Sequence, residues 1–160
     1  MKFVHTELKR DTWIRPAQKV LNADDAVNVV KGMMKDVDRE MVICIHMATS
    51  GRVISTEISA IGTIDQACVS PAEILRTALL SGARSIILMH QHPSGECRPS
   101  EEDIRMTQRL AMAADLMGIQ LLDHIIVGDD DTYSMSRNQP DVLKCMKIQD
   151  FEDIAAEVRR

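Results

Sequence analysis

The sequence predicts an α/β domain in which helices flank a mixed β-sheet. Short apolar segments typical of buried strands alternate along the chain with amphipathic helical segments, a pattern of layered α/β proteins. Two strands come early and are separated by a short turn, and this hairpin argues against an all-parallel sheet. The 160 residues, 45% of them hydrophobic, are enough for one domain with a buried core. Aromatic residues make up only 2%, so aliphatic side chains and methionines must fill that core.

The chain divides into three parts. Residues 1–21 lack clear periodicity and form an N-terminal arm or an extra strand. Residues 22–137 carry the predicted domain. In residues 138–160, apolar residues at helical spacing predict a C-terminal tail with an amphipathic helix: Phe151, Ile154, Ala155 and Val158.

The first half of the domain is predicted to be a helix followed by a hairpin. Asn22 is a typical N-cap, with Asp24 and Asp25 in the first turn. The segment MVICIHM (41–47) predicts a buried strand, and residues 52–60 a second strand after a short turn. The helix is supported by apolar positions at helical spacing: Ala26, Val27, Val30, Met33, Met34 and Val37.

The second half continues with two helices and three strands. Ser70 and Pro71 begin a helix, Glu73 completes a capping box with Ser70, and Gly82 ends the helix. A buried strand is predicted over 85–90. Ser100 begins the next helix, which runs to Gly118. Strands are then predicted over 119–127 and 132–135, on either side of an acidic turn.

Composition excludes several classes of function. The net charge of -5 argues against broad binding to nucleic acid, which needs clustered Lys and Arg. The few aromatic residues provide no platform for stacking bases. The four cysteines form no CxxC pair, and neither a signal peptide nor an apolar run long enough to span a membrane is present. We therefore expect a cytoplasmic protein with reduced thiols and no membrane partner; the oligomeric state is left open.

The segment HQHPSGECRPSEED (90–103) carries the main functional signal. His90 and His92 close a predicted strand and point to the same side of it, and Asp103 can meet them from the following helix. Two imidazoles and one carboxylate are the protein ligands of many catalytic zinc sites, which keep a fourth position for water. The alternative is a strand that ends in two polar residues, with Ser100 and Asp103 as an ordinary capping box. The metal and capping interpretations are compatible.

A zinc deaminase would show the motif H-x-E followed by P-C-x-x-C, and neither motif occurs in this sequence.

A zinc-activated water needs a carboxylate that accepts its proton. Three upstream glutamates are candidates: Glu40, Glu57 and Glu73. Glu73 is assigned to the helix cap, and Glu57 lies in an alternating strand where a solvated side chain is expected. Glu40 stands directly before a buried strand, where its side chain can enter a cleft, and is therefore favoured.

The same segment resembles the JAMM motif of the JAB/MPN metallopeptidase superfamily, H-x-H-x7-S-x2-D, and more narrowly its RadC-type branch with HNHPSG followed by PS and D. Gln91 stands where the branch has Asn. Further segments match the branch in order: GTIDQACVSPAEILRTAL (62–79), GARSIILMH (82–90) and LMGIQLLDHIIVGDDDTYSMSR (116–137).

The resemblance implies a cytidine deaminase-like JAB/MPN architecture, a sheet flanked by helices. It implies that His90, His92 and Asp103 bind Zn²⁺, that Ser100 stabilises the tetrahedral intermediate, and that Glu40 is the general acid/base. The implied reaction is hydrolysis of a peptide or isopeptide bond in a protein substrate of unknown identity. The competing hypothesis is a RadC-like binding or scaffold module, associated with DNA repair or mobile elements, without turnover.

Two nearby residues have alternative roles. Cys97 could close the zinc site as a fourth ligand, but an exposed loop thiol without catalytic duty is favoured. His124, in the strand LLDHIIV, is expected to be a core or edge histidine with a satisfied hydrogen bond. The DH pair of the RadC-type branch at this place also implies a supporting role toward the site.

Overall fold

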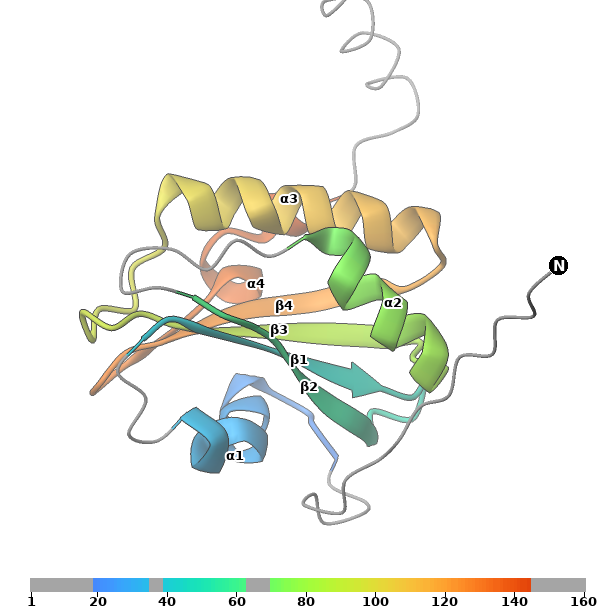
Figure 1. The fold of residues 1–160 in the computed structure, drawn as a ribbon, viewed down its shortest axis with the longest axis horizontal. Helices are drawn as coiled ribbons and strands as arrows, with labels where there is room; N and C mark the ends of the chain where they lie inside the picture. The colour runs from blue at the N-terminus through green and yellow to red at the C-terminus, as the bar shows by residue number, and fades with distance from the viewer. Residues whose placement is uncertain (1–18, 35–38, 63–69, 145–160) are drawn as a thin grey trace, which may run out of the picture.

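The structure is a computed structural model that describes residues 19–34, 39–62 and 70–144. Within these residues, five strands form one sheet in the order β2-β1-β3-β4-β5, which confirms the predicted α/β class with a mixed sheet (Figure 1). The elements are, in chain order, α1 (Ala23–Met34), β1 (Met41–Met47), β2 (Val53–Ile61), α2 (Pro71–Ser81), β3 (Ser85–Gln91), α3 (Glu101–Leu116), β4 (Gln120–Val127), β5 (Thr132–Ser134), α4 (Met135–Asn138) and the 3-10 helix η1 (Pro140–Leu143).

The sheet combines hairpins with one parallel pair. β1 pairs with β2 and with β3 in antiparallel fashion, and β4 pairs antiparallel with β5. β3 and β4 are parallel, because α3 carries the chain back across the sheet between them. In the register between β1 and β3, Met41 lies opposite Gln91. The start of β1 and the end of β3 therefore share one end of the sheet, which brings Glu40 close to His90 and His92.

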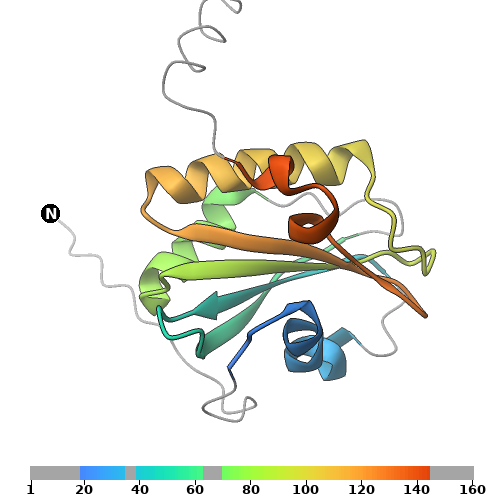
Figure 2. The same ribbon diagram turned by 180° about the vertical axis from the view of Figure 1, so that it is seen from behind.

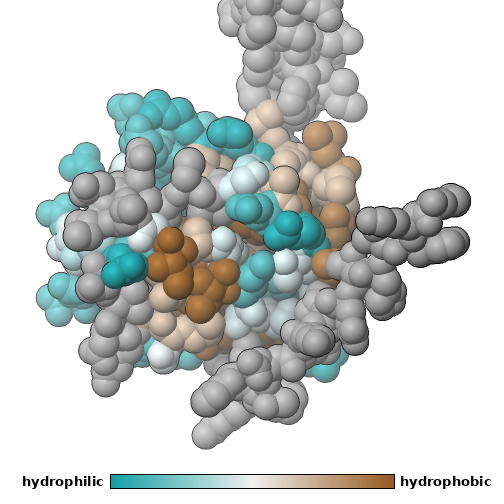
Figure 3. All heavy atoms as spheres, viewed as in Figure 1, coloured by the Kyte–Doolittle hydropathy of each residue, from teal (hydrophilic) through white to brown (hydrophobic). Residues whose placement is uncertain are grey.

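Helices cover both faces of the sheet. Figures 1 and 2 show α2 and α3 on one face and α1 on the other. Ala26 and Val30 of α1 are fully buried against strand residues such as Ile43 and Met89. On the opposite face, Leu110 of α3 packs in a second apolar cluster. In Figure 3 hydrophilic side chains cover the N-terminal part of α3, whereas apolar side chains are exposed toward its C-terminal end, where Leu116 is 69% exposed.

The helix ends follow local sequence signals, with one exception. Gly82 takes a left-handed conformation (φ 70°) and ends α2, as predicted. The predicted capping box at the start of α2 is wrong. The Ser70 hydroxyl accepts from the backbone N–H of Ala72 (3.3 Å), while the N–H of Glu73 donates to the Ser70 carbonyl (3.0 Å). Ser70 alone is therefore the cap of α2, and Glu73 is not used for it.

Some sequence predictions fall outside the described residues. These are the arm up to residue 18, the extension of the first helix to Val37, and the amphipathic helix at 151–158. Conversely, α4 and η1 were not predicted, and Val142 of η1 packs with Ile126 and Met135 in a small apolar cluster. In the part of the chain that is described, no helix has the length and apolar character needed to cross a membrane.

Candidate metal centre

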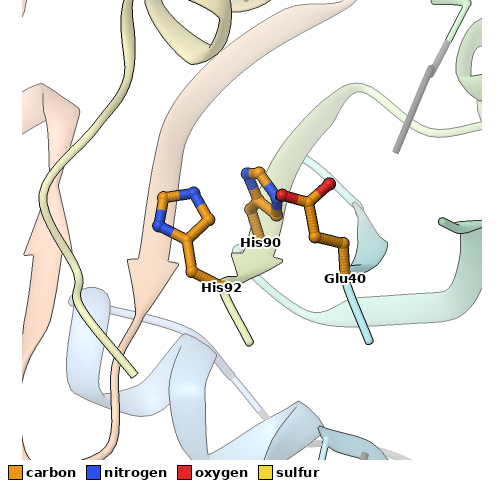
Figure 4. Close-up of side chains that lie close together, drawn as sticks. All are labelled: Glu40, His90 and His92. Carbon is orange, nitrogen blue, oxygen red and sulfur yellow. The ribbon is translucent and has the colours of Figure 1, made fainter. Parts of the chain in front are cut away.

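Side chains from three elements meet at the end of the sheet. His90 is the penultimate residue of β3 and His92 follows that strand, while Glu40 precedes β1. Asp103 comes from the first turn of α3. Figure 4 shows Glu40, His90 and His92 turned toward one another, and their ligand atoms lie within 4.8 Å of one another. The structure thus brings together the two histidines and both carboxylates that the sequence singled out.

His90 is the buried centre of this group, with 5% of its surface exposed. Its Nε2 lies 3.9 Å from Oε1 of Glu40, and its Nδ1 lies 2.9 Å from Oδ1 of Asp103. The shorter distance is within hydrogen-bonding range, but the alignment is not that of a hydrogen bond, so among the described residues both ring nitrogens lack a hydrogen-bond partner. Buried imidazole nitrogens without partners are costly unless something else binds them.

His92 is held by the loop that follows it. Its Nδ1 lies 2.9 Å from the carbonyl oxygen of Glu96. A carbonyl only accepts, so Nδ1 carries the hydrogen and Nε2 faces the site, 3.3 Å from Oδ2 of Asp103. The contact with Asp103 raises the pKa of His92 above its ordinary value, against the opposing effect of burial.

Asp103 connects both histidines to the start of α3. Its Oδ2 accepts from the backbone N–H (2.8 Å) and the hydroxyl (2.6 Å) of Ser100. The Ser100 hydroxyl in turn accepts from the N–H of Asp103 (3.1 Å), which confirms the capping box. Burial alone would raise the pKa of Asp103, but the contacts with His90, His92 and Ser100 outweigh it and hold the pKa well below its usual range. The carboxylate therefore stays ionised.

Glu40 is fixed through its backbone. Its carbonyl accepts from the N–H of Gly62, just past the end of β2, over 2.9 Å. Its side chain is 14% exposed, as is that of His92, against 6% for His90. Glu57, the other upstream candidate, is not the solvated residue that strand alternation predicted. It faces α2, accepts from the Thr77 hydroxyl (2.7 Å), and lies 3.9 Å from His46.

A second layer of contacts supports the histidines. His124 is fully buried and lies almost parallel to His90, with ring centroids 5.9 Å apart and an angle of 12°. The Thr107 hydroxyl donates to the Asp103 carbonyl, so it accepts from the N–H at Nδ1 of His124 over 2.6 Å. The pKa of His124 is lowered to about 3, mainly by burial, so the ring is neutral. The predicted hydrogen bond of His124 is present, while its Nε2 has no partner among the described residues.

Sequence reasoning missed Thr107 and the Glu96 carbonyl. Thr107 stands four residues after Asp103, hence on the same face of α3, and this spacing could have indicated it. Cys97 is half-buried and packs beside Ile126 and Met135, so the expected exposed thiol is only partly correct. The group of ligand atoms found within the described residues consists of Glu40, His90 and His92, and includes neither Cys97 nor Asp103.

Comparisons with known proteins agree with this architecture. A model of the family described as RadC-like JAB domain matches residues 20–140. A UPF0758 protein of Finegoldia magna is 40% identical over 134 residues, which are 82% of this chain and 60% of the relative. A UPF0758 protein of Bacillus licheniformis is 41% identical over 112 residues, 70% of this chain and 50% of the relative. A UPF0758 protein of Methanosarcina acetivorans is 35% identical over 114 residues, 71% of this chain and 50% of the relative. The chain thus spans about half the length of the curated relatives it matches.

Proposed function

Because the chain belongs to the RadC-like JAB domain family, we propose that it is a zinc-dependent hydrolase that cleaves a peptide or isopeptide bond of a protein substrate. One observation carries the proposal. Two histidines and two carboxylates converge at one end of the sheet, and both ring nitrogens of the buried His90 lack hydrogen-bond partners among the described residues. A metal ion would bind the one ring nitrogen that carries no hydrogen.

The donor set suits zinc. Two imidazoles and a carboxylate are common ligands of catalytic zinc, and ligating histidines usually donate their other ring N–H to a carbonyl or carboxylate. The bond of His92 to the Glu96 carbonyl is of this kind. We assign His90, His92 and Asp103 as the ligands, as the resemblance to the JAMM motif implies. The two oxygens of Asp103 approach one ring each, but the ligand atoms that lie within 4.8 Å of one another are those of Glu40, His90 and His92. This assignment leaves Glu40, whose Oε1 lies 3.9 Å from His90 Nε2, as the carboxylate that transfers the proton.

When bound, zinc lowers the pKa of a coordinated water to about 7 and polarises a carbonyl group. Glu40 accepts a proton as the water oxygen bonds to the substrate carbonyl carbon. It returns that proton to the amine nitrogen when the C–N bond breaks. The distance of 3.9 Å between Glu40 Oε1 and His90 Nε2 supports this proposed role.

Ser100 has a double role in this proposal. Its hydroxyl hydrogen is donated to Asp103, so Ser100 orients a ligand and keeps it ionised. Donation to the developing oxyanion of the substrate requires the hydroxyl to rotate away from Asp103, since a hydroxyl carries one hydrogen. We retain this second role as part of the proposal.

The test combines metal analysis with hydrolysis of a panel of C-terminally tailed and isopeptide-linked proteins. We expect about one zinc per chain and cleavage of a substrate by the wild-type protein. Glu40→Gln should keep zinc and lose turnover by about 10²-fold or more. Glu57→Gln is the matched control, because Glu57 contacts Thr77 and His46 instead of the ligand group, and it should retain turnover.

Zinc binding without cleavage of any substrate would instead favour a scaffold module associated with DNA repair or mobile elements.

We also infer a cytoplasmic location with reduced thiols. The two described cysteines, Cys44 and Cys97, are free, and burial raises the pKa of the Cys44 thiol far above its usual value.

A further inference from the structure

We propose that the turn between β4 and β5, residues 128–131, is a positioning element that holds His92 in the metal centre. The inference rests on the proposed zinc site, since it concerns how one proposed ligand is kept in place. The turn and the loop that follows His92 lie side by side at the same end of the sheet in both Figure 1 and Figure 2.

The two segments touch through their backbones. The N–H of Asp129 donates to the carbonyl of Gly95 over 2.9 Å. A Cβ atom on Gly128 would lie 2.5 Å from the Gly95 carbonyl oxygen and 3.1 Å from the backbone nitrogen of Cys97. Only a glycine at position 128 therefore allows the turn to approach the loop this closely.

Gly95, which the turn contacts, and its neighbour Glu96 both form hydrogen bonds with His92. The N–H of Gly95 donates to the His92 carbonyl (3.1 Å), closing a tight turn, and the next residue, Glu96, accepts from the His92 ring (2.9 Å). Gly95 and Glu96 thus hold the backbone and the imidazole of His92 together. Any displacement of this pair moves Nε2, the atom that faces Asp103.

The turn is itself tied to the strand that bears His90. It follows directly from β4, in which Ile126 lies opposite His90 and Val127 opposite Gln91. A side chain pushed between turn and loop would shift His92 relative to His90, because the strands fix one histidine while the loop carries the other. Metal affinity depends on that relative position, and supporting contacts of ligands typically affect it by about 10–100-fold.

The contacts distinguish the two glycines. Gly95 has a φ of 73°, and a Cβ there would lie 2.3 Å from the Asp129 side chain, which can rotate away. At Gly128 the opposing atoms are backbone, so the loop itself must move. Gly128→Ala should therefore displace His92 more directly than Gly95→Ala.

The experiment measures zinc affinity of the full chain by competition with a chromophoric chelator, and the ¹⁵N shifts of the His92 ring in zinc-free protein. Gly128→Ala should weaken zinc binding by about tenfold or more and shift the His92 resonances. The control Gly32→Ala, which adds a methyl group in open space on α1, should match wild type.

A second variant keeps the test decisive if Gly128→Ala does not fold. Gly95→Ala strains a left-handed backbone (φ 73°) in the same contact and should weaken zinc binding and shift the His92 resonances. Wild-type affinity and unchanged His92 shifts in either folded variant would overturn the inference. If wild-type protein binds no zinc, the proposed function fails, while the ring shifts of His92 still decide the positioning claim.

Discussion

The hydroxyl of Ser100 donates to the carboxylate of Asp103 over 2.6 Å, and the same hydroxyl accepts from the Asp103 backbone N–H. One side chain thus caps α3 and orients a proposed zinc ligand. The capping and metal interpretations of this pair are therefore two consequences of one geometry. A Ser three residues before an Asp fixes the start of the helix and, after His90 and His92, helps hold the pKa of the Asp103 carboxyl below its usual range.

Ser100→Ala should lower both folding stability and zinc affinity. Loss of the cap costs about 1 kcal/mol, and loss of the hydrogen bond to Asp103 should weaken zinc binding by about tenfold. Ser70→Ala is the matched control, since Ser70 caps α2 without contacting a ligand, and it should cost similar stability without changing zinc affinity. Equal zinc affinities in the two variants, measured beside urea unfolding, would contradict the dual role.

Thr107→Val should weaken the support behind His90. The substitution leaves the buried His124 Nδ1 without its partner, at a cost of about 1–3 kcal/mol in the free energy of unfolding. Because His124 stacks on His90, zinc affinity should also fall. The comparison is Thr77→Val, which removes the hydroxyl that Glu57 accepts from and should leave zinc affinity unchanged. A zinc dissociation constant that does not distinguish the two variants would argue against the supporting role.

His46 should make the fold sensitive to mild acid. Burial lowers its pKa from 6.5 to about 4, so the unfolded chain takes up a proton that the folded chain excludes. Its contribution to stability is complete above pH 6.5 and is lost as the pH falls toward 4, by about 2 kcal/mol between pH 7 and pH 5. Burial raises the pKa of the neighbouring Glu57, which acts in the opposite sense and offsets part of this loss.

The comparison of wild type with His46→Gln isolates the histidine. The variant remains neutral, so its free energy of unfolding in urea should vary less between pH 7 and pH 5 than that of wild type. Identical pH dependence of the two proteins would show that His46 is not the titrating group.

The order of strands and helices, and the convergence of His90, His92 and Asp103, follow from local patterns. Strand alternation places His90, the Ser100 cap sets where α3 begins, and the loop after β3 holds His92 through the Glu96 carbonyl. Glu57 was misjudged because its environment depends on pairing: it lies opposite Cys44 in β1 and faces α2, which alternation within one strand cannot reveal. The contact between Gly128 and Gly95 likewise joins residues 33 positions apart and depends on the parallel register of β3 and β4.

Zinc stoichiometry of the full chain tests the central claim, that His90, His92 and Asp103 form a metal centre, most directly. After equilibrium dialysis against zinc, elemental analysis should find about one ion per chain in wild type and in Glu40→Gln, and a large loss in Asp103→Asn. Loss in Glu40→Gln with retention in Asp103→Asn would transfer the ligand role to Glu40 and contradict the assignment. A wild-type chain that binds no zinc would contradict the metal centre itself.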